Sequence, residues 1–150
     1  MTDAPSPADF RFSRNLEVRF RDLDGMDHVN NAVFLTYFEQ GRVGYYRALG
    51  LEPGPGTAAT RRYPFILGEV RCRFLSPLLF GETPRVHLRT TRIGSKSFTF
   101  QYLITVDEDG RAVATGDSTQ VYYDYDAMRS VPVPRHVRDT IAAFETPPPS

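Results

Sequence analysis

Residues 21–31 read RDLDGMDHVNN, and the rest of the chain is arranged around this stretch. A run with strand character, Leu16 to Phe20, precedes it, and a long aromatic-rich helical pattern, Ala32 to Leu49, follows it. A strand-to-helix connection needs only one capping side chain, yet this one holds three aspartates, a histidine and two asparagines. Since a helix N-terminus offers unpaired N–H groups and a positive dipole end, this polar cluster indicates a functional site.

The helix is predicted from apolar or small residues at a spacing of three or four, which include Phe34, Phe38, Gly41, Tyr45 and Ala48. Because glycine is unfavourable inside a helix, we expect Gly41 and Gly44 to mark a close approach to a sheet. Gly50 is placed to end the helix in the left-handed conformation.

From Phe65 onward, apolar and polar residues alternate, as is typical of half-buried strands. Hairpin turns are predicted at residues 94–96 and 107–110, with an irregularity at residues 116–117 of the last strand and a short closing helix over 134–144. The order is one strand, a long helix and four strands in a meander. It predicts an α+β domain, with an antiparallel sheet packed on a single long helix.

The 150 residues fit one domain, which we place at 15–145, between a flexible tail over 1–14 and a Pro-rich tail over 146–150. The residues between 52 and 62 are a predicted loop. Lys plus Arg equals Asp plus Glu at 18 each, so we expect neither nucleic acid nor a membrane as partner. The lone Cys72, the lack of a signal-peptide pattern and the lack of a long apolar run favour a cytoplasmic location.

The DLDGMDHVNN motif ahead of Phe34–Glu39 resembles the hotdog-fold acyl-CoA thioesterases, in the 4-hydroxybenzoyl-CoA thioesterase branch. The resemblance extends from about Leu16 to Pro132 and implies a five-stranded antiparallel sheet wrapped around one central helix. It implies that Asp24 is the catalytic carboxylate, as general base or nucleophile, and that a backbone N–H near Asn31 or Ala32 binds the thioester oxygen. It also implies a homodimer or homotetramer with active sites at the subunit interface. Asp27 departs from the glycine that many members have there.

The same chemistry is plausible from the residues alone, because thioester hydrolysis needs a base or nucleophile and donors for the oxyanion. Asp22 and Asp24 are two residues apart, so we expect their side chains to point the same way. Repulsion between the two carboxylates should then raise the pKa of at least one of them. Asp22, Asp27 and Asn30 are interpreted as turn and capping residues. His28 and Asn31 are candidates for contact with the substrate or for structural roles. We expect no metal, since the cluster does not match a calcium loop and has no second histidine.

For the CoA phosphates, the resemblance favours the predicted hairpin, whose cations and hydroxyls are Arg92, Ser95, Lys96 and Ser97. No cofactor is expected, because CoA is part of the substrate. Aromatic side chains that could line an acyl pocket, or simply the core, are Phe34, Tyr37, Tyr63 and Phe65.

The predicted function is an acyl-CoA thioesterase. The alternatives are a hotdog enoyl-acyl hydratase, whose Asn-Pro between Asp and His is missing here, and a non-catalytic acyl-CoA-binding domain.

Overall fold

A computed structural model describes residues 4–53 and 63–150, so most of the predicted loop over 52–62 lies outside the described residues. The elements, in chain order, are η1 (Pro7–Asp9), β1 (Phe12–Asn15), η2 (Phe20–Asp22), α1 (Val33–Ala48), β2 (Phe65–Phe74), β3 (Pro84–Ile93), β4 (Ser97–Val106), β5 (Ala112–Asp124), β6 (Arg129–Ser130) and α2 (Arg135–Phe144). None of the helices in these ranges is long and apolar enough to span a membrane.

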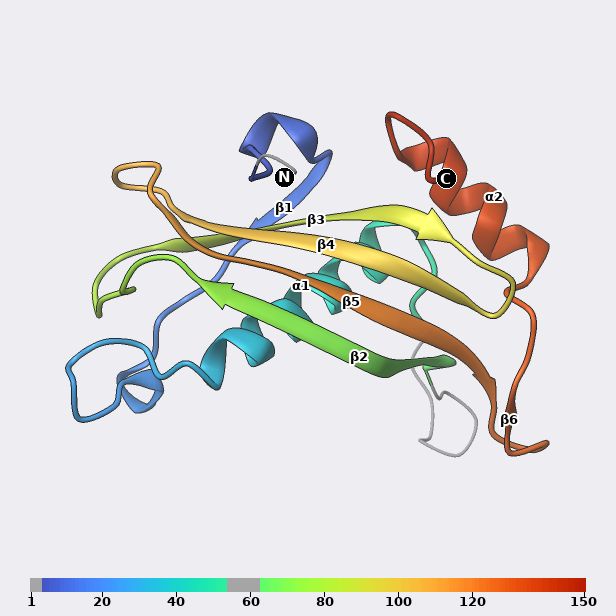
Figure 1. The fold of residues 1–150 in the computed structure, drawn as a ribbon, viewed down its shortest axis with the longest axis horizontal. Coiled ribbons are helices and arrows are strands. Elements are labelled where there is room, and N and C mark those ends of the chain that lie inside the picture. The colour runs from blue at the N-terminus through green and yellow to red at the C-terminus, as the bar shows by residue number, and fades with distance from the viewer. Residues whose placement is uncertain (1–3, 54–62) are drawn as a thin grey trace.

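The strands form one curved antiparallel sheet in the order β1-β3-β4-β5-β2, and the short β6 pairs with β5. The long helix α1 lies behind this sheet in the view of Figure 1, and α2 lies near the end of β3. The predicted α+β class, with an antiparallel sheet around a long helix, is therefore confirmed, as is the closing helix α2.

The position of the first strand differs from the sequence prediction. The strand is Phe12–Asn15, of which all but the last residue lie in the predicted tail, and it pairs with β3 from Phe12↔Leu88 to Asn15↔Arg85. Leu16 and Val18 are buried, as their alternation predicts, but they lie outside the sheet, and Phe20 is 80% exposed at the start of η2. The alternation of apolar and polar residues correctly predicted which side chains are buried. It does not reveal whether the backbone pairs with another strand.

The four-strand meander is also wrong, because only β3, β4 and β5 follow one another across the sheet. The connection over 75–83 carries the chain to the other side, so β2 pairs with β5. The predicted irregularity at 116–117 is absent, and β5 pairs regularly there. A Cβ on Gly116 would lie 2.4 Å from the Arg71 carbonyl oxygen and 2.6 Å from Phe38 Cε2. Gly116 is therefore a position of close packing and not a bulge.

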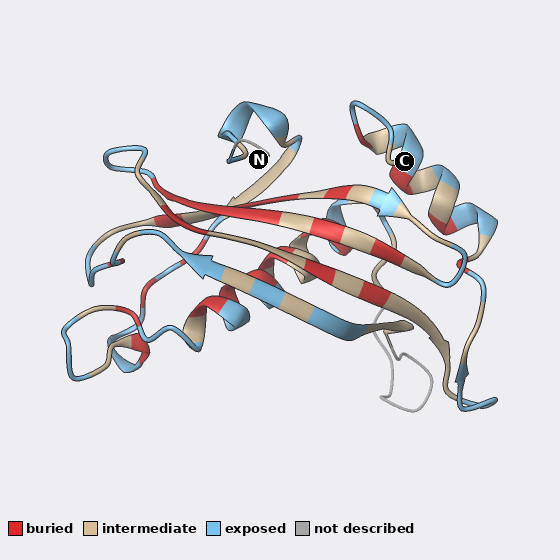
Figure 2. Ribbon diagram, in the orientation of Figure 1, coloured by how far each residue is buried: buried red, intermediate tan, exposed pale blue. Residues whose placement is uncertain are grey.

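The core lies between α1 and the inner face of the sheet. All five apolar residues of the β4 face are at most 1% exposed, namely Phe98, Phe100, Tyr102, Ile104 and Val106. From α1, Phe38 stacks on Tyr102 with ring centroids 4.1 Å apart. Gly41 allows the helix to approach Val86, whose Cγ2 would lie 3.0 Å from a Cβ there. Figure 2 shows the buried residues along β3, β4, β5 and the helix, whereas β2 is mostly intermediate or exposed.

The ends of the helix and of the chain complete the fold. Gly50 has a φ of 71°, which confirms the predicted left-handed helix end, while Ala48 is exposed and does not belong to the buried stripe. The C-terminal residues follow the part of β3 that β1 leaves uncovered, because Ile93 N–H donates to the Ser150 carbonyl at 3.0 Å and Ser150 N–H donates to the Thr91 carbonyl at 3.1 Å. This segment is thus packed on the sheet.

Candidate active site

The aspartate-rich connection folds into a tight turn. Leu23 and Val29 form an isolated antiparallel bridge, and Asp24 N–H donates to the His28 carbonyl at 3.0 Å. Asp27 closes the turn with a φ of 63°, in the left-handed region that glycine usually occupies. The turn expected at Asp27 without glycine is therefore present, and Asp and Asn are the non-glycine residues that tolerate this conformation best.

The Asp24 carboxylate is held at the surface of this turn. Its Oδ1 accepts the N–H of Met26 at 2.8 Å, and 26% of the side chain is exposed. The nearest His28 nitrogen, Nδ1, is 3.8 Å from Oδ1, which is too long for a hydrogen bond. Instead, His28 Nδ1 lies 3.1 Å from the Val29 carbonyl oxygen, which can only accept, so Nδ1 carries a proton. In the described part of the chain, Oδ2 of Asp24 has no hydrogen-bond donor.

Asp22 points in a different direction from the one we predicted. Its side chain is 1% exposed and accepts hydrogen bonds from Arg19 Nη2 at 2.8 Å and from the Tyr37 hydroxyl at 2.9 Å. Burial disfavours the charged carboxylate, but the bonds from Arg19 and Tyr37 outweigh it, so the pKa of Asp22 lies below its ordinary value. The expected repulsion that raises a pKa is therefore wrong for Asp22, and its structural role is confirmed.

Within the described ranges, the start of α1 leaves one backbone donor without a partner. The Asn30 side-chain oxygen accepts the N–H of Ala32 at 2.9 Å, and the N–H groups of Val33 and Phe34 donate to the carbonyls of Asn30 and Asn31. Among the described residues, the N–H of Asn31 has no acceptor. Of the two donors that the sequence indicated, Asn31 and Ala32, the structure leaves only Asn31 available to a ligand.

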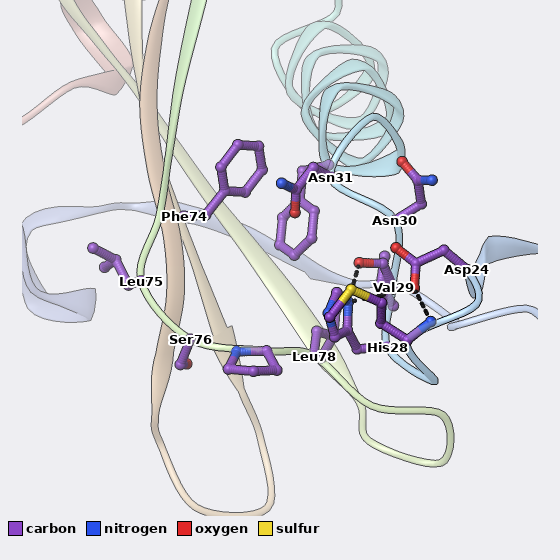
Figure 3. A pocket seen from close by; sticks show the side chains of 12 residues that line it. Asp24, His28, Val29, Asn30, Asn31, Phe74, Leu75, Ser76 and Leu78 are labelled. Atoms are coloured by element: carbon purple, nitrogen blue, oxygen red, sulfur yellow. Dashed lines mark hydrogen bonds and ion pairs between the residues drawn. The ribbon is translucent and has the colours of Figure 1, made fainter.

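The turn and the helix start form one side of a cleft of about 540 Å³, a size typical of small-molecule sites. Figure 3 shows Asp24 and Asn30 on that side, Asn31 in the middle, and Phe74, Leu75 and Ser76 on the opposite side. Three predicted catalytic candidates, Asp24, His28 and Asn31, are thus brought together by the fold.

Sequence reasoning missed the opposite wall, which consists of residues 74–78 at the end of β2 and in the connection that follows. In the sequence, these residues show only the end of an alternating strand pattern, since proline, here Pro77, does not continue a strand. The backbone bond from Val29 N–H to the Leu78 carbonyl, 2.8 Å long, joins this wall to the aspartate turn. The rings of Phe34 and Phe74, with centroids 5.4 Å apart, add a second contact between the two walls. Both contacts are long-range, and no local sequence pattern predicts them.

The hairpin predicted to bind CoA does not reach this cleft in the same chain. The β3–β4 turn lies at the end of the sheet opposite the aspartate turn (Figure 1). Arg92, Ser95 and Lys96 are exposed, and Ser97 is half-buried. Arg138 of α2 holds the turn by donating to the carbonyls of Gly94 and Ser95.

The aromatic candidates separate into three environments. Phe34 lines the cleft, whereas Tyr37 is buried and bonded to Asp22. Tyr63 and Phe65 line a second cavity, farther along α1. Within the described ranges, no three His, Cys, Asp or Glu side chains are grouped closely enough to hold a metal ion.

Replacing the buried carboxylate tests its structural role. We expect Asp22→Asn to lower the free energy of unfolding by about 1–3 kcal/mol at pH 7, because Arg19 and Tyr37 lose a charged acceptor. Since the pKa of Asp22 is lowered by folding, its contribution is complete above the unfolded pKa of about 3.9 and is lost as the pH falls through the folded value. Urea unfolding of wild type and variant should therefore give converging stabilities below about pH 4.

The exposed Asp27→Asn variant serves as the matched control, and its stability should stay close to wild type at both pH values. A stability difference for Asp22→Asn that is the same at pH 7 and at pH 3 would contradict the role assigned to the ion pair.

Comparison with known proteins gives the family. A sequence profile of the thioesterase-like superfamily matches residues 18–141. The uncharacterized protein YsmA of Bacillus subtilis is 28% identical over 94 residues, which are 63% of this chain and 60% of YsmA. A chloroplastic acyl-acyl carrier protein thioesterase of Arabidopsis thaliana is 26% identical over 129 residues, which are 86% of this chain and 66% of that protein. The chain thus spans less than two thirds of the length of either relative.

Solved structures agree with the profile. A thioesterase from Thermus thermophilus, solved in complex with coenzyme A and zinc, superposes with a TM-score of 0.78 at 31% identity, over 92% of this chain and 97% of that one. A gentisyl-coenzyme A thioesterase superposes with a TM-score of 0.74 at 22% identity, over 87% and 99%, which shows a shared fold. The chain therefore belongs to the thioesterase-like superfamily and has the hotdog fold that its sequence predicted.

Proposed function

We propose that this protein hydrolyses an acyl-CoA thioester to a carboxylic acid and free CoA. Membership of the thioesterase-like superfamily supports the predicted class of enzyme, a thioester hydrolase. The observation that carries the proposal is that the Asp24 carboxylate and the start of α1 border the same cleft, and that the Asn31 N–H there has no acceptor among the described residues. These are the two groups that acyl transfer from a thioester requires.

Asp24 can act in either of two ways. As general base, it takes a proton from a water molecule through Oδ2 while the water oxygen attacks the thioester carbonyl. As nucleophile, Oδ2 attacks the carbonyl itself and gives a mixed anhydride, which water then hydrolyses. In both routes the C–S bond breaks and CoA leaves as a thiolate, which gains a proton. The Met26 N–H on Oδ1 fixes the carboxylate and leaves Oδ2 for this work.

We assign the binding of the oxyanion to the N–H of Asn31. As the carbonyl carbon becomes tetrahedral, its oxygen gains negative charge, and a backbone donor at a helix N-terminus stabilises that charge together with the helix dipole. Because Asn30 already occupies the N–H of Ala32, the donor next to it is the one left for the substrate. His28 and the Asn31 amide complete the polar side of the cleft as substrate-contacting groups.

The fold also supports a homodimer or homotetramer. β2 is an edge strand of ten residues, and within the described chain its outer edge pairs with nothing. Long unpaired edges invite association, and exposed apolar side chains lie on and around this strand, including Leu67 at 44%, Phe74 at 44% and Leu75 at 46% exposure. A second subunit on this surface would cover these side chains and bring its own residues close to the cleft, which borders Phe74 and Leu75.

Replacement of the carboxylate tests the mechanism. Asp24→Asn should lower kcat for thiol release from acyl-CoA by a factor of about 10²–10⁴, because the amide is neither a base nor an anionic nucleophile. The protein should remain folded, since Asn can still accept the Met26 N–H. Release of free thiol from short, long and aromatic acyl-CoAs measures the effect and also defines the acyl preference.

Asp27→Asn is the control, because it removes the same charge from the same turn at a residue outside the cleft. Full activity in Asp24→Asn would show that another group does the chemistry. Saturable acyl-CoA binding without thiol release in the wild type would instead identify a binding domain.

A second test concerns the binding of CoA, the group that carries the acyl chain. We propose that Arg92 and Lys96 of one subunit bind the CoA phosphates of a substrate whose acyl group lies in another subunit's cleft, because the hairpin lies far from the cleft of its own chain. Arg92→Ala with Lys96→Ala should raise KM for acyl-CoA several-fold and leave kcat unchanged. The acyl thioester of N-acetylcysteamine has no phosphates and should be hydrolysed equally by variant and wild type.

Arg135→Ala is the matched control, because it removes a cation from an exposed position on α2, where the Arg135 side chain is 93% exposed. If the hairpin variant changes KM for both thioesters to the same extent, or for neither, the hairpin does not bind the phosphates.

A further inference from the structure

The outer face of the sheet, on the side away from α1, carries three basic side chains in a row on β3. Val86 and Leu88 face α1, so the residues that alternate with them, Arg85, His87 and Arg89, face the other way. A side chain on a sheet face without a second layer is normally exposed, yet His87 is only 5% exposed. Another part of the chain therefore covers His87.

The cover is the segment of residues 4–10, which we call the N-terminal strap. The ring of Phe10 lies on His87, with ring centroids 5.7 Å apart. The guanidinium carbon of Arg89 is 5.1 Å from the centroid of the same ring, a distance typical of a cation–π contact. Arg89 Nη1 also donates to the backbone carbonyl of Asp9 at 3.1 Å. Phe10 is thus held between two basic side chains of β3.

The strap continues across the outer face toward β5. At its other end, Ala4 and Pro5 line a groove together with Thr115 of β5. Leu103 of β4 lies between the two ends, because it is paired with His87 on one side and with Thr115 on the other. It alternates with the inward-facing residues of β4, yet it is only 1% exposed. The strap is therefore a second layer over this part of the sheet.

More positive than negative charge surrounds His87. Arg85 forms an ion pair of 3.0 Å with Asp107, in the turn after β4. Arg89 has no such partner, since its acceptors, the Gln101 side-chain oxygen at 2.7 Å and a backbone carbonyl, are uncharged. Across the residues that the structure describes, no carboxylate lies within ion-pair distance of Arg89. A proton on His87 would thus add a third cation to a row that has one counter-ion.

The other elements around His87 do not change this balance. From β4, the Thr105 hydroxyl lies 2.9 Å from His87 Nε2, and from β1 the uncharged Ser13 is paired opposite His87. The carboxylate of Asp9 accepts a backbone N–H within the strap itself. Arg11, just after the strap, donates to a carbonyl at the end of α2. The nearby charges that decide the protonation of His87 are therefore those of β3 and the turn after β4.

The neutral form of His87 is the one that suits this site. Burial and the Arg85 guanidinium lower the pKa of His87, and Asp107 offsets this only in part. Because folding lowers this pKa, the contribution of the neutral ring to stability is complete above about pH 6.5, the unfolded value, and is lost as the pH falls through the folded value. Below it, a cation lies under Phe10, where little water reaches it.

We propose that the N-terminal strap is a pH-sensitive cover, which opens when His87 is protonated and then exposes the outer face of the sheet around Leu103. Opening lets water solvate the imidazolium and breaks only the contacts of the strap with the sheet. β1 keeps its place, because it is paired with β3 from Phe12 to Asn15. Such a local opening needs much less free energy than unfolding of the domain. The proposal does not depend on the proposed function.

NMR titration of the His87 imidazole tests the coupling from one side. Since the closed strap favours the neutral ring, Phe10→Ala, which removes the cover, should raise the pKa of His87 toward its ordinary value. Phe20→Ala is the matched control, because it removes a ring that is 80% exposed and lies elsewhere, and it should leave the pKa of His87 unchanged. An unchanged pKa in Phe10→Ala would overturn the proposal.

Proteolysis tests the coupling from the other side. The rate of chymotryptic cleavage after Phe10, divided by the rate at the same bond in a peptide of residues 4–16 at the same pH, reports the open fraction of the strap. Between pH 7.5 and pH 5.5 this ratio should rise about fivefold or more in wild type. It should stay constant in His87→Gln, whose neutral amide can still bond to Thr105.

A constant ratio in wild type, or an equal rise in wild type and His87→Gln, would show that His87 does not control the strap. If His87→Gln fails to fold, the titration of His87 in Phe10→Ala decides the matter alone.

Discussion

The buried carboxylate of Asp22 holds the site in place. Arg19 and Tyr37 bond its side chain, and its backbone carbonyl accepts the Asn30 N–H at 2.9 Å. These bonds tie together the segment before the aspartate turn, the first turns of α1 and Asn30, which precedes the helix by three residues. The Val29 bond to Leu78 adds the connection after β2. A charged group that is buried and unpaired would be strongly unfavourable, so these partners must stay where they are.

Two carboxylates that are two residues apart thus have separate tasks. Asp22 is fully buried and has several donors, so it remains ionised and serves the structure. Asp24 borders the cleft, one of its oxygens accepts the Met26 N–H, and the other has no hydrogen-bond donor among the described residues. Environment, and not residue type, makes this distinction, as is common where neighbouring carboxylates occur in enzymes. In the proposed function, a substrate carbonyl in this cleft meets both the Asp24 carboxylate and the N–H of Asn31, which has no acceptor among the described residues.

Local sequence patterns predicted the elements well and their pairing poorly. The stripe on α1, the face of β4 and the turn glycine after the helix were evident because each depends on neighbours in the chain. The position of β1 and the placement of β2 beside β5 depend on long-range hydrogen bonds, which alternation does not encode. In the site, Asp24, His28 and Asn31 came from one motif, whereas Phe74 and Ser76 join them only through tertiary contact.

The central claim is that Asp24 and the Asn31 N–H act on the same carbonyl. A crystal structure with an acyl-CoA analogue in which a methylene replaces the thioester sulfur tests it most directly, because the ketone keeps the carbonyl and cannot be hydrolysed. We predict the ketone oxygen at about 2.7–3.1 Å from the Asn31 nitrogen, with the Asp24 carboxylate beside the carbonyl carbon. A bound analogue whose carbonyl contacts neither group would contradict the account.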